Sequence, residues 1–253
     1  MEFALLSVFA FFAGLVDAVV GGGGLIQLPA LLVVYPSAPL PLLLGTNKFA
    51  SCVGTSVAAV RYAQSVTIPM AIVCVAAALA FCFSFLGARS VSLLDPALLR
   101  PLVVIVLFGV LLFTLFRPNL GTLHSPKLPT RKQVAVAGLF SSIIGFYDGF
   151  IGPGTGSFLL FAFVAAIGFD FLHASACAKI INIGTNLAAL AYFVPTGNVR
   201  YDLALCMAVA NMAGAFLGAH LSLKRGTRFI RGFFIAVVVA LLLKQLQQLL
   251  APF

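Results

Sequence analysis

The chain has 253 residues, of which 62% are hydrophobic and only 8% are charged, and its mean hydropathy is +1.16. A soluble domain carries about a quarter charged residues to cover its surface, so 15 Lys and Arg with 6 Asp and Glu exclude a water-soluble globule. The net charge of +9 does not indicate nucleic-acid binding, because most basic residues fall in short breaks between apolar runs, where they act as topology signals. We therefore expect a multi-pass membrane protein.

Apolar segments follow one another along the chain, and each long segment is a candidate membrane-spanning helix, which needs about 20 apolar residues. In the first half the segments are Phe3–Val20, the shorter Leu25–Tyr35, Leu40–Val60, Ile68–Ala88 and Leu98–Phe116. A polar, Pro-rich linker follows, and the same series then recurs. In the second half the segments are Val134–Ile151, Ser157–Ile167, His173–Val194, Tyr201–Leu223 and Phe229–Leu250.

An internal duplication relates the two halves. An offset of 131 residues, without a gap, places Asp148 on Asp17 and Lys179 on Lys48. Apolar matches would carry little weight in so apolar a chain, but charged residues in register indicate a true repeat. We therefore divide the chain into a first membrane repeat (residues 1–116), a cytoplasmic linker (117–132) and a second membrane repeat (133–253).

The number of crossings decides how the repeats are oriented. An odd number in each half inverts the second repeat, whereas four crossings would leave the repeats parallel. The equivalent loops 89–100 and 220–231 differ in charge, since the first has two Arg and one Asp and the second has four basic residues. Inversion explains this difference, because it places only the second loop on the side of the basic linker, which is then cytoplasmic, with both termini outside.

We therefore predict an all-α integral membrane protein of the cytoplasmic membrane. It has two inverted-topology repeats of about five helical segments each, in agreement with the odd count of crossings. Segments that are broken by glycine, or that re-enter the membrane, lie near its centre.

A glycine-rich break follows the first span of each half, at residues 17–24 and 148–156. Four consecutive glycines, or Gly-Pro-Gly-Thr-Gly, do not hold a regular helix, and unwound backbone at membrane depth needs protein or water around it. Such a break exposes amide groups at the start of a half-helix, as in transporter sites. The alternative is a tight turn or a close-packing notch between helices. The candidate binding residues are Gly22, Gly23, Gly154 and Thr155.

One lysine lies within the third segment of each half. Lys48 lies about eight residues into its span, or ~12 Å along the helix axis, and Lys179 is its equivalent. Helical spacing makes each lysine the head of a polar stripe that should face an interior cavity. The other candidate residues are Thr46 and Asn47 before Lys48, Ser51 and Thr55 after it, and Asn182 and Asn186 after Lys179.

The lysines admit two explanations, because a buried cation costs about 2.5–3.5 kcal/mol and needs a compensating partner. In the first, two ammonium groups, four hydroxyl or amide side chains and free backbone N–H groups form a socket for a small oxyanion. In the second, the lysines reach the interface, or Lys48 pairs with Asp17 and Lys179 with Asp148. The aspartates could carry protons, hold the lysines or cap the turns, and the sequence does not rank these roles.

The remaining polar residues and the cysteines are expected to have structural roles. Asn211 is expected to make a helix–helix hydrogen bond, and His124, His173 and His220 are expected to be scattered near span ends or in the linker. The five cysteines lie in apolar runs without a CxxC motif, so we expect no metal site and no cofactor.

At these residues the chain resembles the TauE/SafE family, also called the sulfite exporter or toluene-sulfonate uptake permease family. The resemblance is carried by Gly21–Gly24, Leu44–Lys48, Gly149–Gly156 and Ala178–Asn186, in both halves. It implies an internally duplicated fold, usually counted as four spans in each half, and export or uptake of sulfite, organosulfonates or related small anions. Four spans in each half and an odd number of crossings in each half describe the same structure if the glycine-flanked segments cross only half of the membrane.

The predicted function is secondary transport of small anions, sulfite or organosulfonates, by alternating access around the midplane lysines, with H+ or Na+ as candidate coupling ions. An anion channel of the same architecture is the alternative. A membrane-embedded enzyme is disfavoured, because the six dispersed acidic residues form neither a carboxylate pair nor an HExxH motif. The expected partners are the small anion and the lipid bilayer, not nucleic acid, and the sequence assigns neither the direction of transport nor an oligomeric state.

Overall fold

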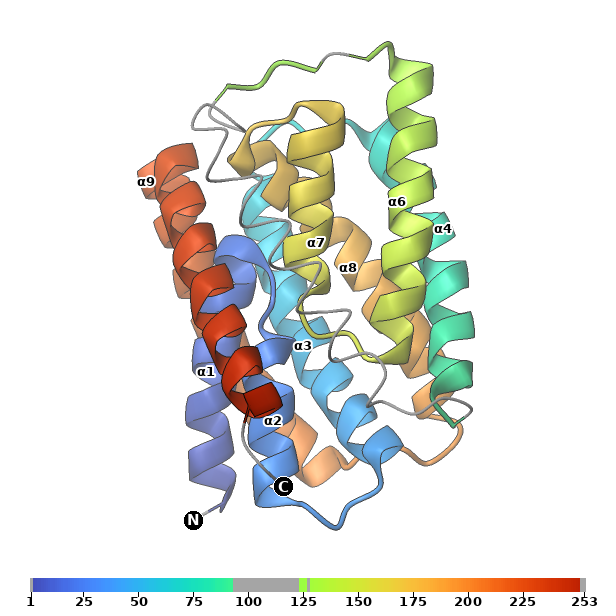
Figure 1. Cartoon of the computed structure of the whole chain (residues 1–253), viewed down its shortest axis with the longest axis vertical. Helices are drawn as coiled ribbons and strands as arrows, with labels where there is room; N and C mark the ends of the chain where they lie inside the picture. Colours follow the sequence, from blue (N-terminus) through green and yellow to red (C-terminus); the bar gives the residue numbers. More distant parts are fainter. Residues whose placement is uncertain (1, 93–122, 127, 251–253) are drawn as a thin grey trace.

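The computed structural model describes residues 2–92, 123–126 and 128–250, and the elements in these ranges are all helical (Figure 1). The first four α-helices are α1 (Glu2–Val20), α2 (Gly24–Val34), α3 (Leu40–Ala63) and α4 (Met70–Arg89), followed by a short 3-10 turn, Ser90–Ser92. The second half contains α6 (Thr130–Phe150), α7 (Thr155–Ala162), the π-helix η3 (Phe163–Ile167), α8 (Phe171–Phe193) and α9 (Tyr201–Leu250). The predicted segment Leu98–Phe116 lies outside the described residues.

The starts of the helices repeat with the offset of 131 residues found in the sequence. α2, α3 and α4 begin at Gly24, Leu40 and Met70, and α7, α8 and α9 begin at Thr155, Phe171 and Tyr201. The residues that favour these helix starts differ between the halves. Pro39 and Pro69 precede α3 and α4, where a missing N–H costs nothing, whereas the Asp170 side chain caps α8 by accepting the N–H of His173.

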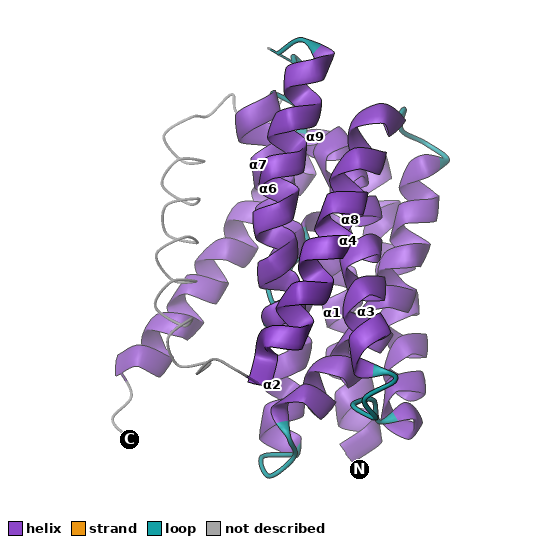
Figure 2. Ribbon diagram, turned by 90° about the vertical axis from the view of Figure 1, so that its right-hand side faces the viewer, coloured by secondary structure: helices purple, strands orange, loops and turns teal. Residues whose placement is uncertain are grey.

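The structure gives more detail for three of the predicted segments. Ser157–Ile167 lies in the short α-helix α7 and in the π-helix η3 that continues it. Tyr201–Leu223 and Phe229–Leu250 lie on the two sides of a kink within α9, at Gly226, where φ is +68° and ψ is −166°, so the predicted division into two helices is confirmed. This left-handed backbone conformation favours glycine, and the part of α9 after the bend leans away from the other helices (Figure 2).

Five of the described helical stretches are long and apolar enough to cross a bilayer, so the protein is a multi-pass membrane protein. They are Glu2–Val20, Met70–Arg89, Thr130–Phe150, Phe171–Phe193 and Tyr201–Val237. α3 has 24 residues and is long enough, but its polar stripe makes it less apolar, and it packs between α8 and α9. α2 has 11 residues, or ~16 Å of helix, about half of the hydrocarbon thickness.

The two halves of the chain are interleaved. α1 packs against α9, α4 packs against α6, and α3 and α8 lie between these pairs. The contacts recur at equivalent positions: a Cβ on Gly14 would lie 2.1 Å from the Asn211 carbonyl oxygen, and one on Gly145 would lie 2.6 Å from the Ala80 carbonyl oxygen. Small residues therefore allow close helix approach at both interfaces. In Figure 1, α1 begins at the lower end of the molecule and α6 begins at the upper end.

The outer faces of these helices carry large apolar side chains. On α1, Leu5, Val8 and Phe12 are 50%, 54% and 51% exposed, at the spacing of successive helical turns. Further exposed apolar residues are Leu139 and Ile143 on α6 and Leu205, Val209 and Phe216 on α9. A surface of this kind is suited to contact with lipid.

Candidate functional site

One glycine break lies between α1 and α2, and the other lies between α6 and α7. The two breaks contact each other. Gly21 and Gly152, which are equivalent in the repeat, both have positive φ, at +78° and +89°. A Cβ on Gly21 would lie 2.2 Å from the carbonyl carbon of Gly156, so only glycine permits this approach. The Ser157 hydroxyl donates to the carbonyl oxygens of Val20 and Gly21, at 3.1 and 3.0 Å. The starts of the half-helices α2 and α7 are thereby held together.

Each of the two buried lysines is paired with the aspartate of the opposite half. Lys48 Nζ lies 2.6 Å from Asp148 Oδ2, and Lys179 Nζ lies 3.2 Å from Asp17 Oδ2. The alternative of pairs within each half, Lys48 with Asp17 and Lys179 with Asp148, is therefore wrong, because α3 and α8 face the break of the opposite repeat. All four side chains are at most 13% exposed. Two buried cations therefore compensate two buried anions.

Hydroxyl groups complete the surroundings of both carboxylates. The Thr55 hydroxyl donates to Asp17 Oδ2 at 3.1 Å, and the Thr155 hydroxyl donates to Asp148 Oδ1 at 2.6 Å. The Lys179 ammonium also donates to the backbone carbonyl oxygen of Asp17. These contacts assign the aspartates a role in holding the lysines. The four charges of the site sum to zero, unlike the pair of uncompensated cations that the stripes alone suggested.

A small cavity of about 20 Å³ lies between the ion pairs and the glycine breaks, which is room for about one water molecule. It is lined by Asp17, Gly22, Gly24, Asn47, Lys48, Ser51, Asp148, Gly152, Gly154, Thr155, Gly156, Asn182 and Asn186. Two buried polar atoms of this lining, Asn186 Nδ2 and Asn47 Oδ1, have no hydrogen-bond partner among the described residues. A donor and an acceptor at this cavity are therefore available to a ligand.

Four of the predicted binding residues do not line the cavity. Lys179 and Thr55 lie beside it, bound to Asp17. Gly23 packs against the backbone of α1, where a Cβ would lie 2.5 Å from the Ala13 carbonyl oxygen. The Thr46 hydroxyl donates to the Leu42 carbonyl oxygen and accepts the N–H of Arg200, so it joins α3 to the start of α9.

Asn211 makes the helix–helix hydrogen bond predicted from the sequence, but its partner in this buried amide pair, Gln27, was not predicted. Gln27, in α2, is fully buried, and its Oε1 accepts a hydrogen bond from Asn211 Nδ2 at 2.8 Å. Gln27 Nε2 also lies 3.4 Å from the carbonyl oxygen of Asn47, to which it donates. Asn211 thus makes a hydrogen bond between helices. A single glutamine within the apolar run Leu25–Tyr35 was the available signal for its partner.

Two of the three histidines are not scattered, which corrects the expectation from the sequence. His124 in the linker and His173 in α8 have ring centroids 4.2 Å apart. Asp170 lies between them, with Oδ2 2.7 Å from His173 Nδ1 and 3.9 Å from His124 Nδ1. The turn after η3 brings the three together although 46 residues separate His124 from Asp170 in the chain.

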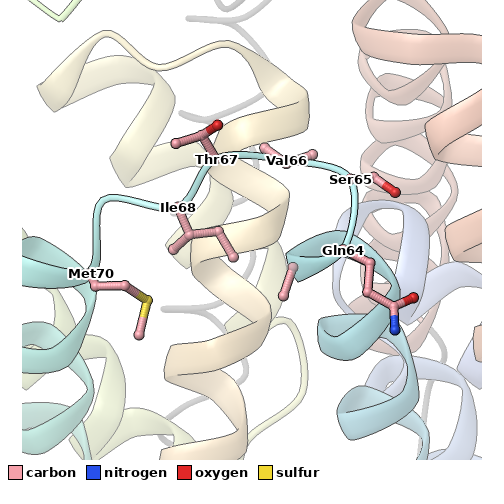
Figure 3. A pocket seen from close by; sticks show the side chains of 7 residues that line it. Gln64, Ser65, Val66, Thr67, Ile68 and Met70 are labelled. Carbon is pink, nitrogen blue, oxygen red and sulfur yellow. The ribbon is translucent and has the colours of Figure 1, made fainter.

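A larger hollow of about 470 Å³ lies at the loop between α3 and α4 (Figure 3). Its lining residues are Ala63, Gln64, Ser65, Val66, Thr67, Ile68 and Met70, none of which is charged. It is wide but offers no group that would balance the charge of an ion. The smaller cavity at the ion pairs is therefore the candidate site.

Comparison with known proteins agrees with this architecture. The profile of the family described as "Sulfite exporter TauE/SafE" matches residues 6–244. A "Probable membrane transporter protein ORF9" of Sinorhizobium sp is 34% identical, with 96% of this chain and 92% of that protein covered. "Probable membrane transporter protein YfcA" of Escherichia coli (strain K12) is 32% identical over 90% of this chain and 83% of its own length. No solved structure matches the chain. The chain therefore belongs to the TauE/SafE family of membrane transporters.

Proposed function

We propose that this protein is a secondary transporter that moves small oxyanions, sulfite or an organosulfonate, across the cytoplasmic membrane by alternating access. The observation that carries the proposal is the crossed pairing of Lys48 with Asp148 and of Lys179 with Asp17 beside a buried cavity. A charged pair inside a membrane bundle is costly and marks an ion pathway. Here each pair joins the two halves of the chain, so relative movement of the halves would change both pairs.

The starts of α2 and α7 support an anion as the substrate. Gly24 and Thr155, the first residues of these half-helices, both line the cavity. The first turn of a helix carries a partial positive charge, which favours an oxyanion. The unpartnered Asn186 Nδ2 adds a side-chain donor on the same cavity. Lysines, amide donors and two helix starts together suit the several acceptor oxygens of a sulfite or sulfonate group.

Charge balance favours H+ over Na+ as the coupling ion. An anion that binds Lys48 competes with Asp148, which then loses its cation although its side chain is buried. A buried carboxylate without a compensating charge favours its protonated form. Binding of the anion would therefore be accompanied by uptake of a proton, and the two would cross the membrane together.

The small size of the cavity favours a carrier over the alternative, an anion channel. A space of about 20 Å³ holds about one water, so an oxyanion enters only when the surrounding helices move. Inverted repeats allow such movement, because the two halves can exchange their roles on the two sides of the membrane. The opposite ends at which α1 and α6 begin support inversion (Figure 1). In the proposed orientation the linker is cytoplasmic and both termini are outside.

Flux measurements in proteoliposomes test this function. Sulfite, sulfate, sulfoacetate and taurine are compared as substrates, under an imposed H+ gradient and under an imposed Na+ gradient. A carrier gives saturable flux that is accelerated by substrate on the opposite side, and an H+ gradient alone drives accumulation. Flux that neither saturates nor shows this acceleration would indicate the channel, and accumulation driven only by Na+ would remove the proton from the mechanism.

Two lysine variants connect this flux to the site. Lys48→Ala and Lys179→Ala should each abolish flux while the protein remains folded, as judged by its elution from a size-exclusion column. Arg200→Ala is the control, because Arg200 pairs with the exposed Asp202 at the start of α9 and does not line the cavity. If both lysine variants retained the flux of the Arg200 control, the lysines would not form the site.

A further inference from the structure

We propose that His124, Asp170 and His173 form a binding site for a divalent transition-metal ion, with zinc as the reference ion. One ligand atom from each residue lies within 4.8 Å of the others. Two imidazole nitrogens and a carboxylate oxygen form one of the ligand sets that bind zinc with an open fourth position. This site is distinct from the buried cavity, because none of its residues lines that cavity.

The distances between the ligand atoms are close to those of a bound ion. Zinc bonds of about 2.1 Å at tetrahedral angles place ligand atoms about 3.4 Å apart. Asp170 Oδ2 lies 2.7 Å from His173 Nδ1 and 3.9 Å from His124 Nδ1. A lengthening of about 0.7 Å in the first pair and a shortening of about 0.5 Å in the second would therefore give both pairs the required separation, which small side-chain rotations provide.

The backbone holds the three residues in place without an ion. The N–H of Ser125, next to His124, donates to the Gly168 carbonyl oxygen at 3.0 Å, which ties the linker to the turn before α8. Asp170 Oδ1 accepts the N–H of His173 at 2.8 Å as the cap of α8. Because Oδ1 is held by this hydrogen bond, Oδ2 faces the two imidazoles. Ligand carboxylates in metal sites are oriented in the same way, by hydrogen bonds from surrounding groups.

The exposure of the cluster suits an ion that arrives from water. The side chains of His124 and His173 are 37% and 27% exposed, whereas Asp170 is 12% exposed. An ion entering between the rings would meet three ligands and keep water in the remaining position.

The cluster has no counterpart in the first half of the chain. With the offset of 131 residues, Asp170 and His173 correspond to Pro39 and Leu42, which offer no side-chain ligand. A bound ion would therefore act at one end of the molecule only. There it would connect the linker between the repeats to the start of α8, the helix that carries Lys179.

Cobalt absorption spectroscopy on the full chain, purified in detergent without a histidine tag, tests the site. Co2+ reports its own coordination through its visible spectrum, and Zn2+ is added afterwards as a competitor. We expect one Co2+ per chain, displaced by Zn2+. His124→Ala and His173→Ala should each weaken binding at least tenfold, whereas His220→Ala, in a different part of the chain, should bind as the unmodified protein does.

Thermal unfolding with and without Zn2+ provides a second measurement. The unmodified protein and the His220→Ala control should gain stability with Zn2+, because an ion that binds the folded state raises its stability. The double variant His124→Ala/His173→Ala should lose this gain while unfolding at the same temperature without metal. Equal Co2+ binding by the double variant and the unmodified protein, or no binding by either, would overturn the proposal.

Discussion

Thr55 and Asn186 occupy equivalent positions in the two repeats, but they do not make equivalent contacts. The Thr55 hydroxyl donates to Asp17 Oδ2 at 3.1 Å, whereas Asn186 Nδ2 has no partner among the described residues. Asn186 is only 3% exposed and lines the cavity. An unpaired buried donor costs stability unless a ligand satisfies it, so this asymmetry distinguishes a structural contact from a candidate substrate contact.

Replacement of Asn186 should therefore impair substrate binding and leave the fold intact. Asn186→Ala removes a donor that has no partner among the residues the structure describes, so we expect a KM for the anion about tenfold higher, corresponding to about 1.4 kcal/mol. Thermal unfolding should be unchanged or shifted slightly upward. Thr55→Ala is the matched control, and it should lower stability by about 0.5–1.5 kcal/mol through loss of its bond to Asp17. Equal KM values in the two variants would contradict the assignment.

The crossed pairing predicts which double substitution restores stability. Lys48→Met alone leaves the Asp148 carboxylate buried without a cation, which should cost about 3–5 kcal/mol. Adding Asp148→Leu should recover most of this loss, because an apolar pair of similar volume replaces the ion pair. Both proteins are compared by thermal unfolding in detergent.

Asp17 provides the control for this cycle. Lys48→Met combined with Asp17→Leu should be less stable than either single variant, because it leaves Asp148 and Lys179 without partners. Recovery in this combination, and not with Asp148→Leu, would show that each lysine pairs within its own half. Flux should be absent in every variant that carries Lys48→Met, since each of these lacks a lysine of the site.

Gly21→Ala should prevent the two breaks from meeting. The φ of +78° costs a residue with a Cβ about 1–2 kcal/mol, and the Cβ would also lie 2.2 Å from the backbone of Gly156. Gly197→Ala isolates the first effect, because φ is +70° there and nothing lies within 4 Å of its Cβ. We expect Gly197→Ala to lose only about 1–2 kcal/mol and Gly21→Ala to lose clearly more, measured as the midpoint of thermal unfolding.

Asn211→Ala should destabilise the protein without changing its affinity for the anion. The substitution leaves Gln27 Oε1 buried and unpaired, at a cost of about 1–3 kcal/mol. Gln27→Leu/Asn211→Ala should be more stable than Asn211→Ala, because neither unpaired amide remains. A changed KM with normal stability would instead indicate that Asn211 contacts the substrate.

The sequence anticipated the helices and the repeat well, because hydropathy and helical periodicity are properties of adjacent residues. It predicted the half-length segments that became α2 and α7, and the positive φ of Gly21 and Gly152 agrees with the expected loss of helix there. It also predicted the division of α9 into two helical parts, which meet at the non-helical backbone of Gly226.

The composition by itself determined that this is a membrane protein, and the register of Lys48 with Lys179 and of Asp17 with Asp148 determined its internal repeat. Only the tertiary structure decided that each lysine pairs with the aspartate of the opposite half, and that His124 joins Asp170 and His173. The physical reason is that charge and periodicity are properties of residues near one another in the chain. The partner of a buried side chain depends instead on the packing of helices that are far apart in the sequence.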